Sequence, residues 1–146
     1  MQSKSGYKTF LAGAIALIVF GAMHLLAVYN ANFREPTDPK MAEISAAAKA
    51  HIIELGPFTP SAWGTMQILN GSYSVLLIYA GVLNLSVMRV AAQAGRLKGL
   101  TVCNIFFVAL LLLITIIFQF PPPMLFAGIA LTLFSASWAK QRSVIR

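Results

Sequence analysis

Residues 62–88 have the sequence AWGTMQILNGSYSVLLIYAGVLNLSVM, a stretch without charged side chains. A helix needs roughly 20 residues, at a rise of about 1.5 Å each, to cross the hydrocarbon core of a bilayer. The stretch is therefore long enough to span a membrane. Its polar groups are amides, hydroxyls and an indole, which can form hydrogen bonds inside a helix bundle.

Three further apolar stretches, at about 9–29, 100–120 and 122–139, have the length of a span. The 146 residues are 58% hydrophobic and 10% charged, with a mean hydropathy of +0.77, whereas soluble domains carry about 25% charged residues. We therefore predict an all-α polytopic membrane protein, a four-transmembrane-helix bundle forming a single domain over residues 1–146. The first span is too long for the apolar part of a signal peptide, which favours a retained helix.

The charged residues predict the orientation of the spans. The first connection, about 30–61, contains all four acidic residues, Glu35, Asp38, Glu43 and Glu54. The positive-inside rule places both termini in the cytoplasm and the first connection outside an inner membrane. Basic segments at span ends also contact anionic membrane lipids, so we expect no nucleic-acid partner. Eight of the eleven basic residues lie outside that connection: Lys4, Lys8, Arg89, Arg96, Lys98, Lys140, Arg142 and Arg146.

The first connection contains a predicted helix over 39–55. Asp38 is suited to the N-cap, Pro39 to the first helical position, and Gly56-Pro57 to the end of the helix. Its apolar residues share one arc, except for Ile53, which falls on the other side. The pattern favours an extracytoplasmic amphipathic helix on the membrane surface or across the mouth of the bundle, with a solvated connector helix as the alternative. The residues of the arc are Met41, Ile44, Ala48, Ile52 and Leu55.

Each predicted span has one small or polar face, and we expect all four faces to point inward. The longest such pattern lies on 62–88. The first span contributes Gly13, Leu17, Phe20 and His24; the second Trp63, Gln67, Asn70, Ser74, Leu77, Gly81 and Asn84; the third Asn104, Leu111, Thr115 and Gln119; the fourth Gly128, Thr132, Ser135 and Ala139.

These polar residues fall into two groups according to their predicted depth in the membrane. Asn84 and Asn104 both lie about four residues from the cytoplasmic ends of their spans, so we predict an interhelical hydrogen bond between them. Near the outer ends, a group of side chains could form a ligand pocket in the outer leaflet. The candidate pocket residues are His24, Trp63, Gln67, Asn70, Thr115 and Gln119.

His24 is the one acidic or basic side chain well inside a predicted span, and such residues are functional candidates. The alternative is a structural histidine that hydrogen-bonds to Gln67 or Asn70. A haem is disfavoured because His51 is the only other histidine and no motif supports the pair. A zinc or di-metal centre is disfavoured because no carboxylate or thiolate lies nearby in sequence. We predict no cofactor and no metal, and leave a quinone or a lipid as candidate ligands.

The spans contain no carboxylate, lysine or arginine, which disfavours an ion-coupled transporter. No catalytic motif is present, which disfavours an enzyme. Two short patterns, Gly21-x-x-His24 and Asn70-Gly71-x-x-Ser74, together with the four-span plan, resemble small uncharacterised bacterial inner-membrane proteins of the DoxX-like kind. The resemblance covers the plan of nearly the whole chain and implies no catalytic residue.

Two functions remain open from the sequence. The first is an auxiliary or interaction subunit of a larger membrane complex, or a homo-oligomer, whose partners are membrane lipids and other membrane-protein subunits. The alternative is a small membrane enzyme or carrier that binds a quinone or lipid around His24. A cavity beside His24 would favour the alternative, whereas a His24 packed and bonded to the second span would favour the first.

Overall fold

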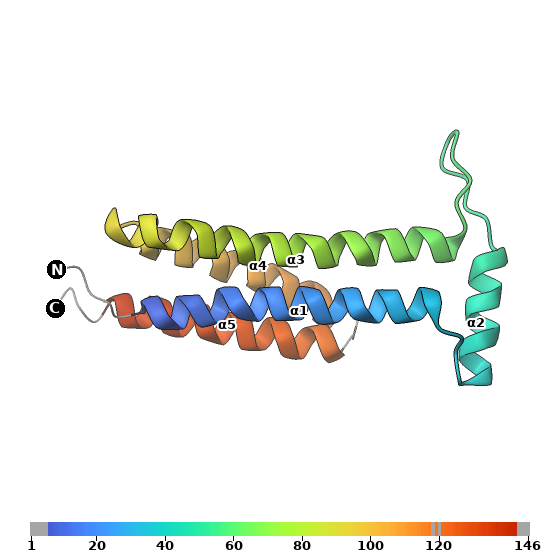
Figure 1. The fold of residues 1–146 in the computed structure, drawn as a ribbon, viewed down its shortest axis with the longest axis horizontal. Helices are drawn as coiled ribbons and strands as arrows, with labels where there is room; N and C mark the ends of the chain where they lie inside the picture. The colour runs from blue at the N-terminus through green and yellow to red at the C-terminus, as the bar shows by residue number, and fades with distance from the viewer. Residues whose placement is uncertain (1–5, 118, 120, 143–146) are drawn as a thin grey trace. The chain divides into compact units, whose positions relative to one another are not determined.

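The computed structural model describes residues 6–117, 119 and 121–142. They form five helices (Figure 1), and four of these, α1, α3, α4 and α5, are long and apolar enough to cross a membrane. The chain is thus a small all-α integral membrane protein with a bundle of four transmembrane helices, as the sequence predicts. The bounds are α1 (Tyr7–Phe33), α2 (Pro39–Ala50), α3 (Ala62–Gln93), α4 (Leu97–Ile117) and α5 (Pro121–Arg142).

The helices divide into two compact units that share α1 and α3. The bundle unit consists of Met1–Phe20 and Leu77–Arg146, and so contains the first half of α1, the second half of α3, and all of α4 and α5. The α2 unit consists of Gly21–Leu76, and contains the rest of α1 and α3 with α2 between them.

The bundle unit packs around aromatic residues and close helix contacts. Phe10 of α1 meets Phe134 of α5 edge to face, with ring centroids 5.3 Å apart, and both are fully buried. Gly13 makes room for Phe134, since a Cβ there would lie 2.9 Å from its ring. At Gly81, a Cβ would lie 2.8 Å from the carbonyl oxygen of Ala14, so α1 and α3 approach each other closely at this point.

The inward face predicted for the last span is wrong. Gly128 is half-buried, and Thr132, Ser135 and Ala139 are exposed. The physical reason is that Phe134 fills the space beside Gly13, and burying a large aromatic side chain outweighs burying small ones. The buried face of α5 is instead formed by Pro123, Ala127, Ala130, Phe134 and Ser137.

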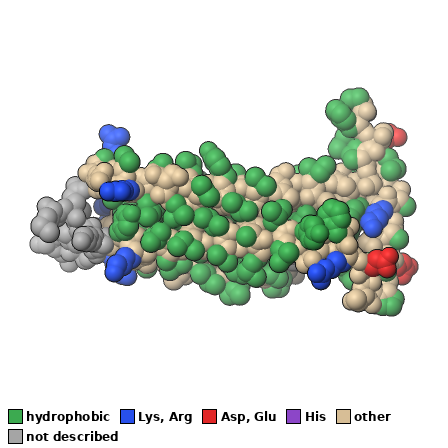
Figure 2. Space-filling model, viewed as in Figure 1, with side chains coloured by type: hydrophobic (Ala, Val, Ile, Leu, Met, Phe, Trp, Pro, Cys, Tyr) green, Lys and Arg blue, Asp and Glu red, His purple; other side chains and the backbone are tan. Residues whose placement is uncertain are grey.

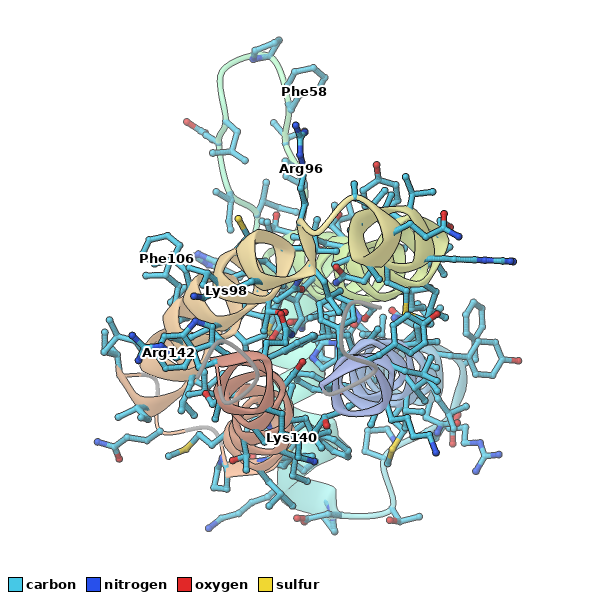
Figure 3. The ribbon with its side chains drawn as sticks, turned by 90° about the vertical axis from the view of Figure 1, so that its left-hand side faces the viewer. Phe58, Arg96, Lys98, Phe106, Lys140 and Arg142 are labelled. Carbon is cyan, nitrogen blue, oxygen red and sulfur yellow. The ribbon has the colours of Figure 1, made fainter. Side chains whose placement is uncertain are left out.

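Basic side chains gather at one end of the bundle unit. Two hydrogen bonds join the helices at this end. Ser137 Oγ donates to the carbonyl of Gly6 at 2.8 Å, and Gln141 Nε2 donates to Thr101 Oγ1 at 3.0 Å. Figure 2 shows the basic groups at the end where α1 begins and α5 ends, and Figure 3 shows four of them around the helix ends. The basic residues described here are Lys8, Arg89, Arg96, Lys98, Lys140 and Arg142.

In the α2 unit, α2 lies across the ends of α1 and α3 (Figure 1). Asp38 is its N-cap, accepting a hydrogen bond from the backbone N–H of Lys40 at 3.0 Å, and Pro39 occupies the first turn, as predicted. The predicted end at 55 is wrong, because α2 stops at Ala50 and His51 is extended. Residues after His51 pair with each other across a tight turn, in bridges between Ile52 and Ser61 and between Leu55 and Phe58.

Candidate functional site at the interface of α1 and α3

His24 joins α1 to α3 in the α2 unit. Its Nδ1 lies 2.8 Å from Ser74 Oγ, and Ser74 Oγ donates to the backbone carbonyl of Asn70 at 2.9 Å. A serine hydroxyl has one proton to give. When Ser74 gives that proton to the carbonyl, it accepts from a protonated Nδ1 of His24; in the other tautomer, Nδ1 accepts the proton of Ser74.

The ring of Tyr73 on α3 also contacts His24. The two rings meet edge to face, with centroids 5.2 Å apart and an interplanar angle of 75°. Ser74 is fully buried, whereas His24 and Tyr73 are half-buried. The imidazole is therefore held by a hydrogen bond on one ring nitrogen and an aromatic contact on its face or edge, both from α3.

A second polar layer lies nearer the start of α3. Trp63 Nε1 donates to Asn32 Oδ1 at 3.3 Å, and Asn32 Nδ2 donates to Gln67 Oε1 at 3.1 Å. The ammonium group of Lys49 lies 5.4 Å from the centroid of the Trp63 ring, within the range of a cation–π contact. Since Gln67 and Ser74 are seven residues apart, the two layers are separated by about 10 Å along the helix.

The structure brings four of the six candidate pocket residues to this interface. His24 bonds to the side chain of Ser74 and also to the backbone of Asn70, one of the two partners that the sequence suggested. Gln67 bonds to Asn32 instead. Asn70 takes part through its carbonyl, and Trp63 belongs to the second layer.

Asn32 is the residue that sequence reasoning missed. It lies eight residues after His24, which places it about 80° around the helix from that residue. The predicted first span ended at 29, whereas α1 continues to Phe33. Extending the predicted span by one turn would have included Asn32 as a further polar residue.

The other two candidates belong to the bundle unit. Thr115 is buried in α4, where its hydroxyl donates to the carbonyl of Leu112 at 2.9 Å. Gln119 is exposed in the turn between α4 and α5, with a positive φ of 50° and its backbone N–H bonded to the carbonyl of Ile116. Each of these two residues therefore has a local structural role in closing α4.

Asn84 and Asn104 form a reciprocal pair between α3 and α4. Asn84 Nδ2 donates to Asn104 Oδ1 at 2.6 Å, and Asn104 Nδ2 donates to Asn84 Oδ1 at 2.9 Å. Both side chains are almost fully buried. This is the interhelical contact that their equal depth predicts, and it fixes the register of the two helices.

The chemistry of these groups is that of neutral donors and acceptors. The α1–α3 interface contains imidazole, hydroxyl, amide and indole groups and no carboxylate. Across residues 6–117, 119 and 121–142, no three His, Cys, Asp or Glu side chains lie close enough to hold a metal ion. The arrangement is suited to joining helices.

The outward face of α5 carries a groove of a different kind. Its lining is mostly apolar and comes from one helix, with Gly128 at its centre: Met124, Leu125, Gly128, Ile129, Thr132 and Leu133. Thr132 Oγ1 donates to the carbonyl of Gly128 at 2.8 Å, so its hydroxyl is satisfied within the helix. The groove therefore presents an apolar surface in which small residues expose the helix backbone.

Comparison of the chain with protein-family models, with curated proteins and with solved structures gives no match.

Proposed function

We propose that this integral membrane protein works by association, as an auxiliary or interaction subunit of a larger membrane complex or as a homo-oligomer. The observation that carries the proposal is the outward groove of α5, centred on Gly128. The proposed location is the inner membrane, with both termini in the cytoplasm. The proposal requires no cofactor.

The groove suits a helix partner because of how helices attract each other in lipid. Lipid tails are as apolar as leucine, so helices associate through close packing rather than through the hydrophobic effect. Small residues four apart let two helix backbones approach, and Gly128 and Thr132 have this spacing. A Cβ built at Gly128 meets no atom within 4 Å, which leaves its face of the helix open to a neighbour.

The surroundings of His24 support a structural role for the polar interface. Its bond to Ser74 and its contact with Tyr73 join α1 to α3, as expected of a histidine that holds helices together. The alternative function, a quinone or lipid bound beside His24, would need a ligand that shares the imidazole with Ser74 or displaces it.

The proposal is tested by filling the groove. Gly128→Leu places an isobutyl group there without a clash inside the chain, because the position is open. The protein is purified gently from its native membrane, and the proteins that travel with it, including further copies, are identified and quantified. We expect the wild type to retain a stoichiometric partner and Gly128→Leu to lose it.

Gly71→Leu is the matched control, since it makes the same change at another open helical glycine. It should retain the partner. Equal recovery of the partner with Gly128→Leu and wild type would refute the proposed interface. Binding of a quinone or lipid that is lost on His24→Ala, with folding intact, would favour the alternative function.

A further inference from the structure

Residues 51–62 form a narrow hairpin that leads directly into α3. The backbone N–H of Ala62 donates to the carbonyl of His51 at 2.8 Å, and that of Ile53 donates to the carbonyl of Pro60 at 2.9 Å. Leu55 and Phe58 exchange two hydrogen bonds, of 2.8 and 3.1 Å, around the turn Gly56-Pro57. Gly56 has a φ of +59°, which a type II′ turn requires at its first central position, and Pro57 excludes a type I′ turn.

The register of these hydrogen bonds determines which side chains share each of the two faces of the hairpin. Residues directly opposite in an antiparallel pair share a face, and so do residues two apart along a strand. One face therefore consists entirely of apolar residues: Ile53, Leu55, Phe58 and Pro60. The other face consists of Ile52, Glu54, Thr59 and Ser61.

The apolar face is exposed at its tip. Leu55 is 52% exposed and Phe58 is 71% exposed. Figure 3 shows Phe58 on the projecting loop. Exposing apolar residues of this size to water on one continuous face is unfavourable, and such patches mark contacts with lipid or protein.

The hairpin is held at the level of the membrane interface by α3. No linker separates them, because Ala62 begins α3 and also closes the hairpin. At about 1.5 Å per residue, the 32 residues of α3 exceed the roughly 30 Å hydrocarbon core, so its ends reach the headgroup layer. Figure 1 shows the hairpin running across the direction of α3, which places it in the plane of that layer.

We infer that the face formed by Ile53, Leu55, Phe58 and Pro60 inserts into the interfacial layer of the lipid leaflet beside the start of α3. Lipid is the occupant because the segment leads directly into the span α3, so lipid surrounds it at this depth. The opposite face keeps Glu54 and Thr59 toward water, as an interfacial segment requires. Trp63, one residue into α3, lies where aromatic side chains mark the membrane interface.

Site-directed spin labelling tests the insertion. In a Cys103→Ala background, cysteines are introduced one at a time as Leu55→Cys and Phe58→Cys on the apolar face, and as Glu54→Cys and Thr59→Cys on the polar face. Each nitroxide-labelled protein is reconstituted in phosphatidylcholine vesicles. Its collision rates with oxygen, which concentrates in lipid, and with a nickel chelate, which stays in water, are then measured. All four positions are exposed, so the substitutions leave the helices intact.

We expect labels at 55 and 58 to collide more with oxygen and those at 54 and 59 more with nickel, so that the preference reverses between neighbouring residues. Equal nickel accessibility at all four positions would overturn the inference. Shielding of 55 and 58 from both reagents would also overturn it, and would indicate a protein partner at this face. The result is independent of Gly128, so it does not depend on the proposed association through α5.

Discussion

The imidazole of His24 and the hydroxyl of Ser74 lie 2.8 Å apart and tie the second half of α1 to the first half of α3. Ser74 Oγ also lies within hydrogen-bond distance of the backbone carbonyl of Asn70, so the two helices are joined through a short chain of polar groups. In hydrocarbon, such groups need partners within the protein, which gives the pair a structural value of its own.

His24→Ala should lower the stability of the detergent-solubilised protein by about 1–2 kcal/mol, because it removes one interhelical hydrogen bond and an aromatic contact. A double-mutant cycle with Ser74→Ala should give a coupling energy of about 0.6–1.7 kcal/mol. Thermal or denaturant unfolding measures both. Ser72→Ala, at an exposed serine on the same helix, is the control and should change little. Additive effects of His24→Ala and Ser74→Ala would show that the bond contributes nothing.

The Asn84–Asn104 pair should respond differently to single and double substitution. Either Asn84→Leu or Asn104→Leu leaves the other buried amide without its partner on the facing helix, which costs about 1–3 kcal/mol, although Asn104 Nδ2 keeps its bond to the carbonyl of Leu100. Replacing both by leucine removes the unpaired group, so the double variant should be more stable than either single variant. Unfolding measurements on the three proteins test this. A double variant less stable than both single variants would contradict the reciprocal bond.

Gly81→Ala should destabilise the bundle unit by about 1–3 kcal/mol through overpacking. The new methyl group would lie 2.8 Å from the carbonyl oxygen of Ala14, and a backbone atom cannot move aside as a side-chain tip can. Gly71→Ala, at an open helical position, is the comparison and should be neutral or stabilising by up to about 1 kcal/mol. Equal stability of the two variants would mean that α1 and α3 do not approach closely at Gly81.

The proposed orientation is tested with a membrane-impermeant thiol reagent. In a Cys103→Ala background, Lys49→Cys in α2 and Arg96→Cys between α3 and α4 report on opposite sides of the membrane. The positive-inside rule predicts that reagent added from the periplasmic side labels the cysteine at 49 and leaves that at 96 unlabelled until the cells are opened. The reverse pattern would place the basic end of the bundle unit outside.

The sequence predicts the buried face of α3 better than the buried face of α5. The polar face of α3 is predicted well, since Ser74, Leu77, Gly81 and Asn84 are all buried, because helical periodicity places them on one side. The buried face of α5 is predicted wrongly. It depends on the packing of Phe134 against Gly13, which is distant in sequence, and helical periodicity carries no information on such a contact.

The first connection shows a second reason for error. Asp38 and Pro39 correctly mark the start of α2, since capping is local. Its end at Ala50 was missed because the pairing of 51–62 depends on residues across the turn. Ile53, which did not fit the helical arc, is explained by the hairpin, where it shares a face with Leu55.

For the candidate site, the sequence predicts most of the residues but not which of them pair. His24, Trp63, Gln67 and Asn70 were found from helical spacing, whereas the pairing of His24 with Ser74 depends on how two helices meet. The patterns Gly21-x-x-His24 and Asn70-Gly71-x-x-Ser74 end on the two residues that the hydrogen bond joins. The resemblance to DoxX-like proteins stays a prediction.

Photo-cross-linking from an introduced cysteine in the native membrane tests association through α5 most directly. In a Cys103→Ala background, Thr132→Cys places a thiol in the groove, and Phe106→Cys places one on an exposed face of α4 as the control. Each thiol is labelled with a benzophenone maleimide, and illumination should link the label at 132 to a second copy or to another subunit and leave the Phe106→Cys protein unlinked. If neither protein is linked, or if both are linked equally, α5 is not the surface through which this protein associates.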